Sequence, residues 1–562
     1  MSGPETPLTQ LPVNAPDILM NRPLDRQVDV TIETNVLEPV SHSYVSSNGG
    51  RTRWVLPKRG VLDASECAIS FQLLDVEGTN GQNNLCFPLH SGALACVNRC
   101  TLRSGTQILS QVVNAGQYGT MKANFNTSGY KEGVLDAYHL SSNVTRNRVL
   151  PAKLAAGVAA PSFHQVYNVE ADQTSEFGRL YSTVSNTHVA QPSKCLKQTA
   201  GQGPEIVIRL GDIFPIFSSG FKLPLLGMAQ VELEIEWTRG GIAGQTGTDI
   251  TDCNVTTGGA DSANTYENAD KTCETTMTTP YIIMDLHHYD DMETQKIRDA
   301  IDSPAGMSID FTEVVVTKGV NPAIAAVANT VSAVQSTHLL GMSMKEVQCI
   351  YVQKNYSLNS TRGIVERDHL YPDAASVQMA LHRNPMLRQY KSQQIFGEEY
   401  NFVINNNRLY PAPVANKATQ YNYLNQTYYR PYNCAPGEFD TTNYNQNATQ
   451  VLMSAGCADG VPEAPATGEG FSHKYLPGSS NYFGLSLEKN VYSGSESRAV
   501  RGNGMRIGST PIEFQYQCLK MGNRTAPDPV TVSQAADVDL TFYIDYRRSM
   551  IINSLGVVVS DA

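Results

Sequence analysis

Polar and apolar residues alternate along much of this chain, and the pattern is clearest in the segment VELEIEW (231–237). Side chains of a β-strand point alternately to its two faces, so this segment predicts a strand with one apolar and one acidic face. Such a strand is typical of an antiparallel sheet that is buried on one side and wet on the other. The two faces carry Val231, Leu233, Ile235 and Trp237 against Glu232, Glu234 and Glu236.

Similar runs recur on both sides of this segment and predict many short strands. Residues 206–237 begin with another strand, followed by a compact apolar turn region with two prolines. The other predicted strands lie at 29–40, 67–76, 93–104, 106–112, 276–290, 307–319, 336–354, 399–411, 481–489, 505–518 and 537–552. Many short strands with few helices favour a sandwich, a barrel or a jelly roll.

Two segments have helical character. DMETQKIRDAID (291–302) places Ile297, Ala300 and Ile301 on one face, and a Ser-Pro-Ala-Gly sequence follows it as a stop signal. The second candidate runs from about 374 to 391. The first of these helices separates two β-rich halves of similar length, which predicts two domains of the same class.

The first 26 residues contain five prolines and therefore predict neither a helix nor a central strand. They also carry more apolar residues than a solvated tail needs, including Ile18, Leu19 and Met20. We expect an extended arm that docks on its own subunit or on a neighbouring one. Two polar segments, 241–280 and 422–471, predict long exposed loops.

Composition narrows the functional classes. The chain has 562 residues, of which 41% are hydrophobic and 17% charged, and its net charge is −11. A broad basic surface for gripping nucleic acid is therefore not expected. The eleven cysteines form no CxxC pair, which favours free buried thiols over a zinc site. No secretory signal or membrane-spanning run is recognisable, so we expect a soluble protein that folds in the cytosol.

The glutamate row is the first candidate for chemistry. Neighbours on one strand face lie about 7 Å apart, within the carboxylate spacings that glycosidases use. Catalysis, however, requires two carboxyl groups in different environments, and the surroundings of Glu232, Glu234 and Glu236 look alike. A solvated or arginine-paired outer face is the alternative interpretation, and we favour it.

The second candidate is DLHHYDD (285–291), with two histidines and three aspartates. Adjacent strand residues point to opposite faces, so His287 and His288 would not converge on one metal ion as the His-x-His pair of a cupin does. The turn DVEGTNGQNN (75–84) lacks the register of a calcium loop. We therefore predict no catalytic, cofactor-binding or metal-binding residue, and no cofactor.

Five segments together resemble double jelly-roll major capsid proteins, in particular the virophage and Polinton-like virus group, with those of nucleocytoplasmic large DNA viruses as more distant relatives. Their order along the chain carries the resemblance. They are DIFPIFSSGFKLPLLGMAQVELEIEW (212–237), YIIMDLHHYDD (281–291), EYNFVINNNRLYPAP (399–413), GSTPIEFQYQ (508–517) and LTFYIDYRRSMIINSLGVVVS (540–560).

The resemblance implies an all-β chain of two antiparallel eight-stranded jelly rolls side by side, with long loops and a few short helices. The corresponding divisions are an N-terminal extended arm (1–26), a first jelly roll (27–290) with an exposed insertion (241–280), a helical linker (291–305) and a second jelly roll (306–562). The loops would form outer towers, and the arm would lie at the inner face.

As a function, the resemblance implies a major capsid protein that is no enzyme. It would form pseudo-hexagonal homotrimers that tile an icosahedral shell around a double-stranded DNA genome, after synthesis in the host cytoplasm. Implied partners are neighbouring capsomers, penton and minor capsid proteins and an internal membrane, without sequence-specific nucleic-acid binding. Two alternatives stay open: a β-sandwich protein that binds or cleaves glycans through the glutamate row, and a bicupin-like metalloenzyme that uses His287 or His288.

Overall fold

The structure is a computed structural model, and most of the chain's predicted strands lie within the part it describes. The described residues are 12–20, 28–45, 49–75, 84–88, 92–124, 181–184, 187–190, 193–197, 205–238, 275–324, 331–356, 396–429, 482–488, 503–521, 533–534 and 537–561.

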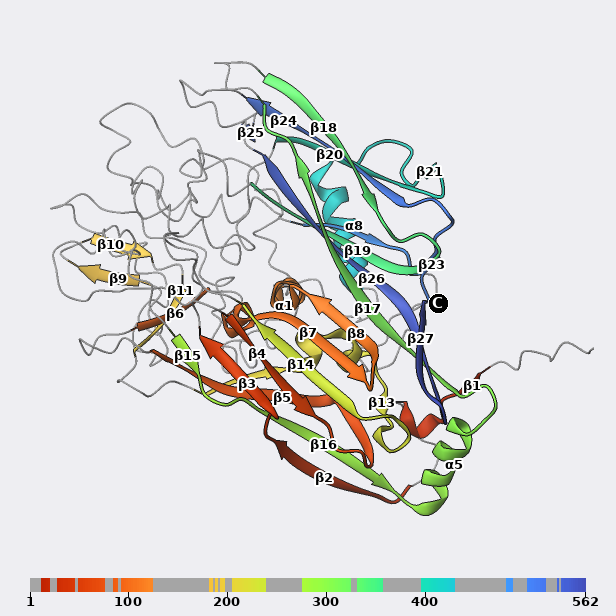
Figure 1. Ribbon diagram of the computed structural model, residues 1–562. Helices are drawn as coiled ribbons and strands as arrows, with labels where there is room; N and C mark the ends of the chain where they lie inside the picture. Colours follow the sequence, from red (N-terminus) through yellow and green to blue (C-terminus); the bar gives the residue numbers. More distant parts are fainter. Residues whose placement is uncertain are drawn as a thin grey trace, which may run out of the picture.

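The first half of the chain forms eight principal strands, coloured red to yellow-green in Figure 1. They are β2 (Val30–Leu37), β4 (Gly49–Val55), β5 (Val61–Asp75), β7 (Val97–Ser104), β8 (Gln107–Val113), β12 (Glu205–Arg209), β14 (Val231–Trp237) and β16 (Tyr281–Tyr289). They pair in the orders β2-β16-β5-β12 and β4-β14-β7-β8. We call this unit the first roll.

The second half repeats this arrangement in the green to blue part of Figure 1. Its principal strands are β17 (Met307–Asn321), β18 (Val331–Leu340), β19 (Glu346–Tyr356), β20 (Phe396–Ile404), β21 (Asn407–Arg408), β22 (Tyr482–Ser486), β24 (Ile512–Met521) and β26 (Val538–Asn553). They pair as β17-β26-β19-β22 and β18-β24-β20-β21. We call this unit the second roll.

The strand order is the same in both rolls. The first strand pairs with the eighth, the eighth with the third and the third with the sixth. The second strand pairs with the seventh, the seventh with the fourth and the fourth with the fifth. This order is that of two antiparallel jelly rolls in tandem, as the resemblance implied.

Shorter elements complete the described part. They are β1 (Val13–Asn14), η1 (Asp17–Leu19), β3 (Ser41–Val45), β6 (Asn84–Pro88), η2 (Gly92–Cys96), α1 (Ala115–Asn124), β9 (Tyr181–Val184), β10 (Thr187–Ala190), β11 (Ser193–Lys197), α4 (Leu210–Ile213), η5 (Pro215–Ser218), β13 (Lys222–Leu223), η6 (Leu225–Gly227), β15 (Thr275–Met277), α5 (Asp291–Ile301), α8 (Lys417–Tyr429), β23 (Met505–Arg506), β25 (Ser533–Gln534) and β27 (Gly556–Asp561).

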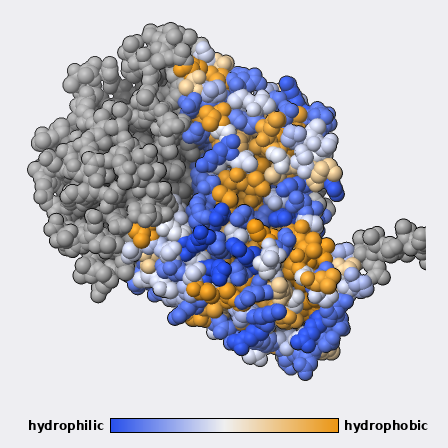
Figure 2. Space-filling view, viewed as in Figure 1, coloured by the Kyte–Doolittle hydropathy of each residue, from blue (hydrophilic) through white to orange (hydrophobic). Residues whose placement is uncertain are grey.

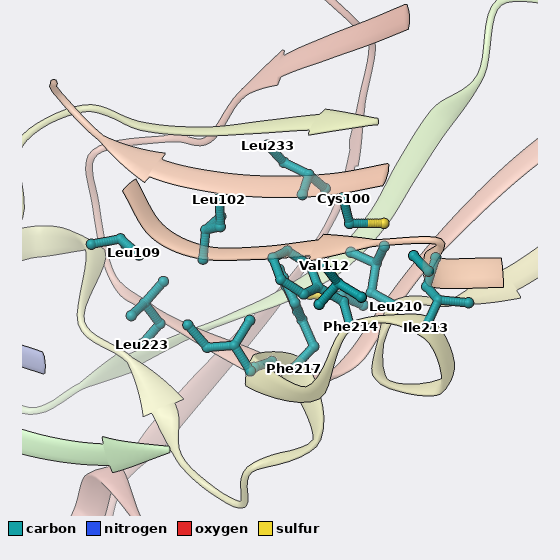
Figure 3. Close-up of a cluster of buried hydrophobic side chains, with 14 of the residues drawn as sticks. Cys100, Leu102, Leu109, Val112, Leu210, Ile213, Phe214, Phe217, Leu223 and Leu233 are labelled. Carbon is teal, nitrogen blue, oxygen red and sulfur yellow. The ribbon is translucent and has the colours of Figure 1, made fainter. Parts of the chain in front are cut away.

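Strand β14 forms as the alternation predicted. Its apolar residues at 231, 233, 235 and 237 are all buried, whereas the intervening glutamates are partly exposed. Leu233 packs near Leu102 of β7 and Leu109 of β8, and the apolar turn after β12 supplies Phe217 from below (Figure 3). Burying each such side chain contributes about 1.5–3 kcal/mol. The apolar turn therefore closes the core of the first roll.

Helix α5 joins the two rolls and is confirmed almost residue for residue. Asp290 caps its N-terminus, where the carboxylate accepts a hydrogen bond of 2.8 Å from the backbone of Glu293. Ile297, Ala300 and Ile301 are buried on the predicted face, and Met292 lies exposed off that face. The helix ends as expected before the Pro-Gly sequence.

The N-terminal strap, which we define as residues 12–20, docks on its own chain and touches both rolls. Strand β1 pairs in parallel with β17 of the second roll, at Met307 and Ser308. Met20 forms an antiparallel bridge with Phe221 of the first roll. Between these contacts, Ile18 and Leu19 are buried in the main hydrophobic cluster. The arm was expected to dock on its own subunit or on a neighbouring one. Its described part docks on its own subunit.

Several predicted segments need correction. The first residues of the predicted strand 93–104 belong to the 3-10 helix η2, and the predicted strand 505–518 is divided between β23 and β24. The stretch from Asn422 was expected to be loop, yet helix α8 extends to Tyr429. The run 336–354 was treated as one strand, but the chain breaks between β18 and β19, where Met344 adopts a positive φ of 64°. The helix candidate at 374–391, and almost all of the 241–280 insertion, lie outside the described residues.

The strap generates a stability prediction. Leu19 is 0% exposed, so Leu19→Ala should lower the free energy of unfolding by about 2–5 kcal/mol. Val13 is 45% exposed on the same strap, and Val13→Ala, the matched control, should change it by less than about 0.5 kcal/mol. Chemical denaturation followed by fluorescence measures both. Equal effects of the two substitutions would mean that the strap is not docked.

Candidate functional site

The first roll covers the outer face of the second roll's sheet β17-β26-β19-β22. Successive residues of β19 belong to different hydrophobic clusters: Ile350 and Val352 pack inside the second roll, whereas Tyr351 belongs to the cluster that contains the core of the first roll. The Tyr351 hydroxyl donates a hydrogen bond of 3.3 Å to the Thr427 carbonyl of α8. Val314 of β17 and Tyr543 of β26 belong to the same cluster as Tyr351 and are 3% and 0% exposed. Helix α1 lies at this junction, between the two rolls in Figure 1. The two rolls therefore share one continuous apolar interface.

A buried carboxylate lies in this interface. Asp545 of β26 is 0% exposed, and its Oδ1 accepts a hydrogen bond of 3.1 Å from the Tyr118 hydroxyl of α1. The Cys349 thiol donates to Oδ2 at 3.4 Å. A buried carboxylate requires such donors because its desolvation is costly. The contact from Tyr118 ties helix α1 of the first roll to β26 of the second.

Glu313 of β17 is a second buried carboxyl group at the same interface. It is 2% exposed and lies beside Ser110 and Gln111 of β8. Burial raises the pKa of Glu313 to about 7, and Arg548, with its guanidinium 3.5 Å away, offsets only part of this effect. The group is thus able to change its charge near neutral pH inside the contact between rolls.

The glutamate row is paired with arginines, which agrees with the interpretation favoured from the sequence. Glu236 lies 2.5 Å from Arg99, Glu234 lies 3.4 Å from Arg103, and Glu232 lies 3.7 Å from Arg53. The arginines come from the strands on either side of β14, namely β4 and β7. Cross-strand pairs of this kind stabilise a sheet. The row is therefore accounted for by cross-strand pairing, without the two contrasting carboxyl groups that glycan cleavage requires.

The two histidines of β16 do point apart. His287 is 9% exposed, and its Nδ1 accepts a hydrogen bond of 2.9 Å from the Lys222 ammonium. Its Nε2 lies 3.7 Å from Asp63. Burial, followed by the charge of Lys222, lowers the pKa of His287. The ammonium therefore occupies Nδ1, and Nε2 faces the carboxylate of Asp63.

His288 contacts a different residue, Glu33 of β2, at 2.9 Å. Among the described residues, no group of three potential metal ligands is close enough to hold an ion. The absence of catalytic, cofactor and metal residues stays a prediction, because the loop 75–84 and several others lie largely outside the described residues. No helix of the described part is long and apolar enough to span a membrane.

The sequence did not identify the residues that join the rolls. In β26, Asp545 falls on the polar side of an alternating strand, a side that is typically exposed to water. The structure buries that side because a second domain packs on it. Only the large aromatic neighbour Tyr543 on the same side could have signalled this burial. Five described cysteines are buried, as predicted: Cys67, Cys96, Cys100, Cys349 and Cys518.

Comparisons by sequence found no matching family model and no matching curated protein. Comparison by structure finds the PBCV-1 virus capsid, quasi-atomic model, with a TM-score of 0.51 and 11% identity, covering 96% of this chain and 99% of that one. PBCV-1 VP54 fitted into the virophage Sputnik matches with a TM-score of 0.49 and 10% identity, over 96% and 99% of the two chains.

The Sputnik virophage structure itself aligns with a TM-score of 0.47 and 12% identity, over 100% of this chain and 95% of that chain. At such low sequence identity, these similarities show the fold alone. The argument rests on the similarity to the PBCV-1 capsid, which has the TM-score of 0.51. The chain has the double jelly-roll fold of the viral capsid proteins that it resembles, which confirms the predicted fold class.

The buried carboxyl group of Glu313 generates a pH prediction. Its pKa of about 7 in the folded protein lies above the ordinary value of 4.5 for a glutamate, so the folded state holds a proton that the unfolded chain has already lost. Stability is therefore lost as the pH rises from 4.5 to 7, by about 3 kcal/mol. Glu313→Gln removes this loss, so the variant should be more stable than the wild type at pH 8.

The measurement is the free energy of unfolding of both proteins between pH 5 and 8. The comparison at pH 5 is the control, because both side chains are then uncharged in the folded state. A difference between the two proteins that does not change with pH would contradict the assignment of the raised pKa to Glu313.

Proposed function

We propose that this chain is a major capsid protein, a structural subunit that builds the shell of a virus particle. The observation that carries the proposal is the end-to-end likeness to the PBCV-1 capsid coordinates, which covers 96% of this chain and takes in both jelly rolls in order. Fold alone does not determine function. Here the glutamates of the proposed glycan site are paired with arginines, and His287 of the proposed metal site contacts Lys222. The described residues therefore do not favour either alternative function.

In this proposal, three copies form a pseudo-hexagonal capsomer, and capsomers tile an icosahedral shell around a double-stranded DNA genome. Two jelly rolls of equal strand order give each copy two similar units, so three copies present six. Neighbouring capsomers, penton and minor capsid proteins would be the partners in the virion, after synthesis in the host cytoplasm. The net charge of −11 leaves contact with the genome to other proteins.

We also propose the domain division given by the resemblance, with an arm (1–26), a first roll (27–290), a linker (291–305) and a second roll (306–562). The internal strand order and the position of α5 support these boundaries. The chain needs no catalytic residue and no cofactor in this role, because its work is binding to copies of itself.

Self-association tests the proposal. The purified chain, with a mass of 61.3 kDa, should form a trimer in light scattering, and electron microscopy should show hexagonal particles or shells. Stable capsomers require interfaces of about 2,000 Å² or more, so the trimer should survive dilution to micromolar concentration. A chain that stays monomeric at high concentration and in high salt would contradict the proposed function.

A further inference from the structure

An ammonium and a carboxylate meet inside the second roll, between its two sheets. Figure 2 shows hydrophilic residues spread over the surface of both rolls, where charged side chains are usually found. Lys354 of β19 and Glu398 of β20 are instead 1% and 2% exposed. The Lys354 ammonium donates a hydrogen bond to Oε2 of Glu398, and the two residues belong to opposite sheets of the roll. The contact therefore joins the two sheets through their shared core.

The strand pattern directs both side chains into that core. Lys354 follows Val352 by two positions along β19, and Glu398 precedes Tyr400 by two positions along β20. Val352 and Tyr400 both belong to the hydrophobic cluster of the second roll. Because residues two apart on a strand share a face, the two charged residues extend rows that are otherwise apolar.

Aromatic rings enclose the pair. Phe483 of β22 lies beside the Lys354 ammonium, with 4.4 Å between the nitrogen and the ring centroid. Tyr516 of β24 donates a hydrogen bond of 2.8 Å from its hydroxyl to Oε1 of Glu398. Tyr400 packs on Phe483 with 4.4 Å between the ring centroids, and all three rings are at most 1% exposed. The carboxyl group is therefore shielded from bulk water, with the ammonium at one oxygen and a phenol at the other.

We propose that Lys354 and Glu398 condense to an amide, which forms a covalent cross-link between β19 and β20. The hydrogen bond places Nζ of Lys354 next to Oε2, the oxygen bonded to the Cδ atom that the amine would attack. Holding two reactants in this way replaces a collision in solution by a step within one molecule. Apolar surroundings favour a neutral amine and a carboxylic acid over the ion pair, and a desolvated lysine amine is a nucleophile. The cross-link goes beyond the proposed function and does not depend on it.

The step balances without a co-reactant. The ammonium first transfers a proton to Oε2, which gives a neutral amine and a carboxylic acid. The amine lone pair then forms the Nζ–Cδ bond, while Tyr516 donates its hydrogen bond to the negative charge that develops on Oε1. A second proton passes from the nitrogen to Oε2, the Cδ–Oε2 bond breaks, and one water molecule leaves. Nothing is oxidised or reduced, and Tyr516 keeps its proton.

The product removes a cost that the ion pair carries. Two charges in an apolar core lose hydration that their attraction only partly restores. The amide has no net charge, and its oxygen would still accept the hydrogen bond from Tyr516. The enclosure by aromatic rings also keeps bulk water from the amide, which slows the reverse hydrolysis.

Mass spectrometry of the denatured full-length chain tests the proposal. The cross-linked chain should be lighter than its sequence mass by one water molecule. Trypsin should not cut after Lys354, and the peptide that contains Lys354 should be joined to the peptide that contains Glu398. Lys520 is the internal control: it is 0% exposed, but its ammonium donates to the backbone carbonyls of Asn321 and Pro322, so trypsin should cut after it.

Two variants assign the roles of the side chains. Lys354→Arg keeps the positive charge but has no amine to attack the carboxyl group, so it should have the full sequence mass. Tyr516→Phe keeps the ring but removes the donor to Oε1, so the cross-link should form about 100-fold more slowly. The matched control is Tyr410→Phe, which removes a hydroxyl from the same hydrophobic cluster and should leave the rate unchanged. The rate is the fraction of the lighter chain at intervals after cell-free synthesis.

The outcomes are separate from those of the proposed function. A folded wild type of full sequence mass overturns the cross-link, even if neither variant folds. A missing water that maps to any other pair of residues overturns the assignment to Lys354 and Glu398. Equal rates for Tyr516→Phe and the wild type overturn the role of Tyr516. Since the mass is measured on denatured single chains, none of these results depends on whether the chain forms trimers.

Discussion

The contact between the two rolls is the constraint on which the rest of the structure depends. The outer face of the sheet β17-β26-β19-β22 carries Tyr351 and Tyr543, and both side chains are fully buried. Removing their apolar surface from water favours the folded state. Covering that face also removes Asp545 and Glu313 from water, so the covering roll must bring donors to them. Tyr118 meets this requirement at Asp545. Apolar packing and polar pairing thus hold the first roll in one orientation.

The segments between the rolls follow from this contact. Helix α5 turns the chain from β16 to β17, and the strap pairs with β17 at one end and with Phe221 at the other. Gly227 packs closely on α5, because a Cβ there would lie 2.1 Å from Cδ1 of Ile301, which would have to move aside. Helix, strap and apolar turn therefore form a joint that links the two rolls without a long linker.

The sequence predicted what depends on local pattern and missed what depends on distant contacts. The bounds of β14 and α5 followed from alternation and capping, which operate over a few residues. Helix α8 was missed because its Tyr- and Asn-rich sequence shows no apolar stripe; Leu424 and Thr427 pack closely on Gly484, which lies far along the chain. The partners of the glutamate row were predicted as a class, but the choice of Arg53, Arg99 and Arg103 required the strand order of the sheet.

The repeated glutamates show how context decides chemistry at equivalent positions. Glu33 is open to solvent, and the hydrogen bond from His288 lowers its pKa. Glu313 occupies the same position in the second roll, because each glutamate lies opposite the residue that follows an aspartate of the eighth strand. Burial nevertheless raises the pKa of Glu313 to about 7. At Glu33, water and the contacts with His288 and Arg59 favour the charged carboxylate, whereas at Glu313 the loss of water outweighs the contact with Arg548.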